Sequence, residues 1–102
     1  EGLVSIKINN GPVKNGFFEE VITFVLTLKK YPINLNNIVF IYDGTTVNIK
    51  HFNTEFFLGE ASDLARKASV VGYYISEEPC EGEIRVVYTE DGKDTRAVTN
   101  CD

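Results

Sequence analysis

Five consecutive apolar residues, Ile38 to Tyr42, constrain the fold of this chain more than any other segment. A strand with one face in water alternates apolar and polar residues, whereas a strand covered on both faces is apolar throughout. The run ends at Asp43-Gly44, a turn dipeptide. Together with a strand–helix–strand unit before it, this run predicts an α/β fold with a parallel sheet, a right-handed crossover and helices on both faces.

A helix is predicted from Asn15 to Lys30, although the β-rich residues 21–28 within it also suit a strand. Asn15 can cap its N-terminus, Glu19 and Glu20 lie at the positive end of the helix dipole, and two lysines follow Leu28 at the negative end. The apolar residues of this segment cover a wide face. We therefore expect the helix to be mostly buried against a sheet.

Periodicity and turn signals predict the other elements. Residues 45–57 stay open, because their alternation suits a hairpin strand only in part. The predicted segments are a strand over Gly2–Ile8, a helix over Glu60–Ser69, a strand over Val70–Ile75, and a C-terminal β-hairpin of Glu83–Thr89 and Asp94–Asn100.

Length and charge limit the function classes. The 102 residues predict a single domain, 1–102, and no apolar run is long enough for a membrane span. The net charge is −5, and because residues 1–75 carry seven acidic and seven basic side chains, the whole excess lies in residues 76–102. The basic residues are scattered and are not clustered with aromatics, so nucleic acid is not an expected partner.

Two cysteines and the lack of methionine point to an exported protein. A chain without Met that begins at Glu1 suggests processing, such as removal of a signal peptide. Cys80 and Cys101 flank the two ends of the predicted hairpin, so a disulfide between them is geometrically easy. Paired cysteines are typical of secreted proteins, and we expect an extracellular location.

Several features, taken in their order along the chain, match a known family. They are Asn10-Gly11-Pro12, the helix ending at Lys30, the segment Tyr42 to Val47, the helix 61–69, the strand 70–76 and Cys80. In these features the chain resembles the DsrE/DsrF-like family of small sulfur-relay proteins over roughly residues 2–82. The resemblance implies a three-layer α/β fold with a mainly parallel sheet and assembly into dimers or larger rings. It also implies that a cysteine after a late strand carries a persulfide, and Cys80 alone has that place. An α+β ferredoxin-like sandwich is the alternative fold.

The setting of Cys80 argues against a reactive thiol. Acidic residues surround it, at Glu77, Glu78, Glu81 and Glu83. Negative charge raises the pKa of a thiol, whereas a nucleophilic cysteine needs positive surroundings. We therefore expect no catalytic residue and treat Cys80 as a persulfide carrier only as an alternative.

No metal or cofactor is expected. His51 is the only histidine, and it has no triad or nucleophile-elbow context, so we interpret it as an ordinary surface or turn residue. A zinc site would need His51, both cysteines and an acid to converge without the usual ligand spacing. No glycine-rich phosphate loop is present. The sequence leaves open whether the protein binds a small molecule.

An apolar cluster in the open segment is a candidate interface. It consists of Phe52, Phe56, Phe57 and Leu58. Such a cluster either packs in the core or marks a subunit contact or amphiphilic surface. The resulting expectation is a secreted, non-enzymatic protein that acts as a homo-oligomer, such as a dimer, or at a surface, for example in a foam or extracellular matrix. A sulfur carrier that uses Cys80 is the alternative.

Overall fold

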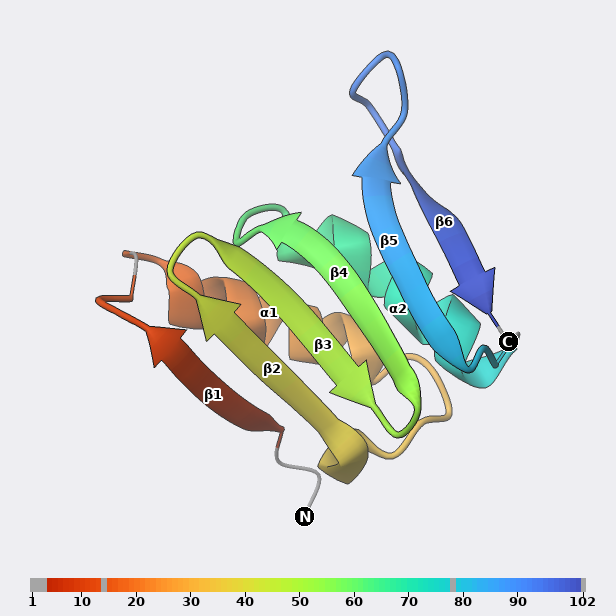
Figure 1. Cartoon of the computed structure of the whole chain (residues 1–102), viewed down its shortest axis with the longest axis horizontal. Coiled ribbons are helices and arrows are strands. Elements are labelled where there is room, and N and C mark those ends of the chain that lie inside the picture. Colours follow the sequence, from red (N-terminus) through yellow and green to blue (C-terminus); the bar gives the residue numbers. More distant parts are fainter. Residues whose placement is uncertain (1–3, 14, 78, 102) are drawn as a thin grey trace.

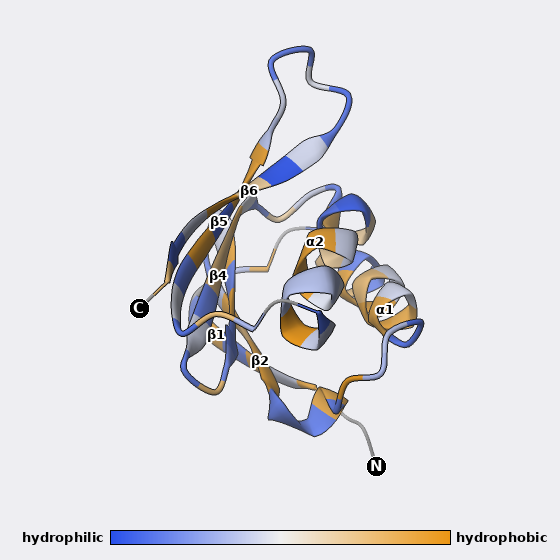
Figure 2. Ribbon diagram, turned by 90° about the vertical axis from the view of Figure 1, so that its right-hand side faces the viewer, coloured by the Kyte–Doolittle hydropathy of each residue, from blue (hydrophilic) through white to orange (hydrophobic). Residues whose placement is uncertain are grey.

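The computed structural model describes residues 4–13, 15–77 and 79–101. In this part of the chain, six strands form one sheet, and two α-helices lie on one of its faces (Figures 1 and 2). The helices are α1 (Phe17–Leu28) and α2 (Leu64–Ser76), and a 3-10 turn, η1 (Leu35–Asn37), precedes β2. The strands are β1 (Ser5–Asn10), β2 (Ile38–Asp43), β3 (Thr46–His51), β4 (Thr54–Glu60), β5 (Gly82–Tyr88) and β6 (Thr95–Cys101).

The strands follow each other across the sheet in chain order. β1 and β2 run parallel, joined through α1, and β4 and β5 run parallel, joined through α2. β3 and β6 each return antiparallel to the strand before them, and β3 also pairs antiparallel with β4. The chain thus passes twice through a strand–helix–strand–strand unit, and each parallel pair has the helical crossover that such pairs need.

The α/β class and the C-terminal hairpin, β5–β6, are confirmed. The predicted layers are not found, because both helices cover the same face and the described chain forms two layers (Figure 2). The sheet is also not mainly parallel, since only two of its five strand pairs are. The ferredoxin-like alternative shares the two layers, but it has split strand–helix–strand units, whereas here the parallel strands are direct neighbours.

The core lies between the helices and the sheet. Phe40 of β2 contacts Phe24 of α1 edge-on, with ring centroids 5.1 Å apart, and Tyr42 contacts Phe17 at 4.7 Å. The intervening Ile41 is only half-buried on the other face of the sheet. The prediction that residues 38–42 are covered on both faces is therefore wrong. A continuous apolar run fits a strand whose second face is only partly shielded by its neighbours.

Two local predictions also need correction. Residues 70–75, predicted as a strand, belong to α2, because Leu64, Ala68 and Val71 form one buried helical stripe that continues past Ser69. Packing of this stripe overrides the β propensity of valine and tyrosine. This change also removes the strand 70–76 from the features that carried the family resemblance.

The predicted Asn15 cap is likewise not found, since Gly16 is the N-cap residue of α1 and no side chain caps the helix there. The open segment contains β3 and the first part of β4. Gly2 and Leu3 of the first predicted strand lie outside the described residues, as does Glu78.

Candidate functional site

The Cys80–Cys101 disulfide closes the C-terminal end of the sheet. Cys80 lies between α2 and β5, and Cys101 ends β6, where it pairs with Gly82 across the hairpin. The two sulfurs are bonded and the Cα atoms are 5.3 Å apart. The described residues contain no free cysteine. Persulfide chemistry at Cys80 would first require reduction of this bond, because the thiolate is the nucleophile.

The four residues predicted as an interface do not form one surface. Phe56 and Leu58 face the helices and are buried in the core, so for them the interface prediction is wrong and the core alternative holds. Phe57 faces the other side of the sheet, where the Arg85 guanidinium lies 4.5 Å from its ring centroid. Phe52, in the β3–β4 turn, is 66% exposed. Strand alternation separates these neighbours in sequence onto opposite faces.

The most exposed apolar residues of a regular element lie on α1. Phe18, Ile22 and Leu26 are 51%, 58% and 57% exposed. They are spaced by four residues and therefore lie in one row along the helix, which we call the α1 stripe. The buried face of α1 consists of Phe17, Val21, Phe24 and Leu28. The expectation of a mostly buried helix is thus wrong for these three residues.

The exposed α1 stripe was not predicted from the sequence, although the width of the apolar face of this helix indicates it. Apolar residues cover more of α1 than the roughly 100°-wide face that a helix usually buries against a core. The sheet beneath α1 and the single helix beside it cannot cover such a wide apolar surface. The excess therefore marks an exposed stripe.

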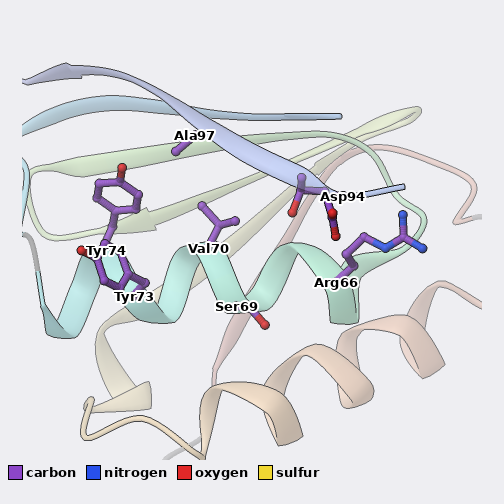
Figure 3. Close-up of a pocket in the computed structure, with 8 residues that line it drawn as sticks. Arg66, Ser69, Val70, Tyr73, Tyr74, Asp94 and Ala97 are labelled. Atoms are coloured by element: carbon purple, nitrogen blue, oxygen red, sulfur yellow. The ribbon is translucent and has the colours of Figure 1, made fainter. Parts of the chain in front are cut away.

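A cleft lies between α2 and β6 (Figure 3). Its volume is about 620 Å³, within the range of small-molecule sites. Figure 3 shows Tyr74 pointing from α2 toward Ala97 of β6, with Val70 further along the helix and Arg66 and Asp94 at the opposite end. The cleft has an aromatic end and a charged end, but no nucleophile–base pair lines it. No group of three or more potential metal ligands occurs in the described parts of the chain.

A buried amine holds the end of β4 against α2. Lys67 is 2% exposed, and its Nζ donates a hydrogen bond to the Glu60 carbonyl oxygen at 2.9 Å. Burial lowers the pKa of Lys67, and the nearby carboxylates of Asp63, Glu60 and Glu20 oppose this shift. Because the amine has no open side for a substrate, we assign it a structural role.

Two neighbouring groups complete this polar cluster. The Tyr88 hydroxyl donates to Asp63 Oδ2 at 2.9 Å, and the Tyr88 ring lies 5.6 Å from Lys67 Nζ. Glu20 of α1 accepts a hydrogen bond from the Leu64 amide at 3.1 Å and so caps α2. The cluster therefore joins both helices to the strand ends. Sequence reasoning missed it, because its members are far apart in the chain.

His51 gives the protein a measurable pH dependence. It lies half-buried at the end of β3, against the Phe52 ring, and burial lowers its pKa below the ordinary 6.5. As the pH decreases through 6.5, His51 is protonated in the unfolded chain while it stays largely neutral in the folded chain. The free energy of unfolding therefore falls as the pH decreases through this range. We expect His51→Gln to lose this part of the pH dependence, as measured by urea unfolding between about pH 7.5 and 5.5. If the free energy of unfolding changed equally with pH in His51→Gln and in wild type, this role of His51 would be contradicted.

Comparisons with known proteins do not extend these observations. No protein-family model, curated protein or solved structure matches the chain. Within the described residues, no helix is long and apolar enough to cross a bilayer.

Proposed function

We propose that this protein is a secreted, non-enzymatic interaction protein that acts through the α1 stripe, by self-association or by adsorption at an interface such as that of a foam or matrix. The carrying observation is that Phe18, Ile22 and Leu26 are each more than half exposed in a single row. Burial of apolar surface is favourable by about 25 cal/mol per Å². A row of this kind therefore favours contact with another apolar surface.

The disulfide supports an extracellular location, because such bonds persist in oxidising compartments. It also leaves Cys80 without the thiol that a sulfur carrier needs. Activity through the α1 stripe requires none of the sulfur chemistry of the DsrE/DsrF-like family. A relationship to that family stays a proposal, supported by the α/β class alone, because Cys80 follows the helix α2 and not a strand.

Adsorption at an air–water interface tests this function. We expect wild-type protein to lower the surface tension after a short lag, and Ile22→Lys/Leu26→Lys to lengthen that lag about tenfold, because two apolar contacts are replaced by charges. Val98→Lys is the matched control, since Val98 is an exposed apolar residue of β6 outside the α1 stripe. Circular dichroism shows whether each variant is folded.

Two results would contradict the proposed function. A double variant that adsorbs as fast as wild type and associates equally well would exclude the α1 stripe as the functional surface. A wild-type protein that neither adsorbs nor self-associates would overturn the proposed function altogether.

A further inference from the structure

The α1 stripe lies on a flank of α1 that α2 does not cover. The side of α1 facing α2 is polar, with Glu20 bonded to the Leu64 amide. The groove between the helix N-termini is lined on the α1 side by Asn15, Gly16, Glu19, Glu20 and Thr23. No stripe residue lines this groove, and Glu19 lies at the boundary between the groove and the stripe. The flank is therefore available to a partner, and its own charges indicate which partner fits.

Opposite charges border the two ends of the stripe. Glu19 lies beside Phe18 in the first turn of α1, and Lys29 follows Leu26 just beyond the last turn. Both residues are exposed. A partner helix that runs antiparallel and carries a basic end opposite Glu19 and an acidic end opposite Lys29 would complement this flank. α1 itself has these properties.

The spacing allows the apolar and charged contacts to form in one register. Glu19 lies three residues before Ile22, and Lys29 lies three residues after Leu26. An antiparallel register that sets Ile22 against the partner's Leu26 therefore also sets Glu19 against the partner's Lys29. A two-fold axis makes each contact twice, as in an isologous dimer. The dipoles of two antiparallel helices also attract each other, which adds a favourable electrostatic interaction.

We propose that the α1 stripe binds a second copy of this chain through a symmetric, antiparallel α1–α1 contact, with Ile22 against the partner's Leu26 and Glu19 against the partner's Lys29. This inference rests on the proposed function and specifies its partner. A lipid or air surface does not present one basic and one acidic group placed to pair with Glu19 and Lys29, whereas a second copy presents both.

Charge exchange tests the contact on the full chain by sedimentation equilibrium. We expect wild type to dimerise reversibly, and Glu19→Lys or Lys29→Glu to weaken dimerisation about tenfold or more. The exchange variant Glu19→Lys/Lys29→Glu should recover the wild-type dissociation constant to within about threefold. Both single changes and their combination oppose the helix dipole, so loss of helix stability alone would make the exchange variant the worst of the three.

Matched controls separate specific contacts from net charge. Glu90→Lys and Lys93→Glu make the same charge changes in the exposed β5–β6 loop and should leave dimerisation unchanged. Ile22→Lys/Leu26→Lys should abolish it. Failure of the exchange variant to recover dimerisation would overturn this register, and dimerisation that persists in Ile22→Lys/Leu26→Lys would overturn the contact. A wild-type chain that is monomeric up to about 1 mM yet adsorbs through the α1 stripe would overturn this inference and leave the proposed function intact.

Discussion

Cys80→Ala/Cys101→Ala should unfold roughly 10–20 °C below wild type, because removal of the disulfide costs about 3 kcal/mol in a domain of this size. The bond joins residues 21 positions apart, so it restricts a long loop of the unfolded chain. It also holds β6, an edge strand in which most side chains are exposed. The measurement is the midpoint of thermal unfolding by circular dichroism, with reductant-treated wild type as the second sample.

Hydrogen exchange shows where the stability is lost. Amide protection should fall in β6 first and remain in β2, whose side chains on the helix-facing side are fully buried. Unchanged unfolding midpoints for both the variant and the reduced protein would mean that the bond contributes nothing to stability.

Gly82→Ala should destabilise the fold by about 2–4 kcal/mol, through backbone strain and a steric clash. Gly82 has a φ of +143°, and a Cβ there would lie 2.2 Å from the Asn100 carbonyl oxygen. The clash is with the backbone of β6, which pairs with β5 on both sides of this contact. Relief requires β6 to move away from β5 beside the disulfide. Urea unfolding measures the loss.

Gly92→Ala is the matched control. Gly92 also has a positive φ, +71°, but a Cβ at this position would meet no atom within 4 Å beyond its chain neighbours. The variant should lose only the cost of the backbone conformation, about 1 kcal/mol. Equal losses for Gly82→Ala and Gly92→Ala would show that β6 accommodates the methyl group. The close β5–β6 contact at Gly82 would then have no energetic role.

The predictions that held depend on interactions close in sequence. The β5–β6 hairpin surrounds Asp91-Gly92, and a hairpin brings residues at equal distances from its turn together, which explains why Cys80 and Cys101 could be paired. The helical character of α1, in place of a strand, was predicted from charges at its two ends. In each case the deciding residues lie within one hairpin or one helix.

The predictions that failed depend on where separate elements pack. The end of α2 carries valines and tyrosines that favour a strand, but the row formed by Leu64, Ala68 and Val71 packs on the core as a helix. The same holds for Phe56 and Leu58 of β4, which are buried although they share a segment with Phe52, which lies in the β3–β4 turn and is exposed. Neither outcome can be derived from composition, because the partner surfaces come from other parts of the chain.

Local sequence patterns were sufficient for the α/β class, the C-terminal hairpin and the pairing of Cys80 with Cys101, because charge, turn residues and chain reversal act over short distances. Packing between distant elements settled which face of the apolar run at residues 38–42 is covered and which apolar residues of α1 stay exposed. Both helices pack on one face of the sheet, so one sheet and one neighbouring helix cannot cover all of α1. The candidate functional surface is the apolar area that remains.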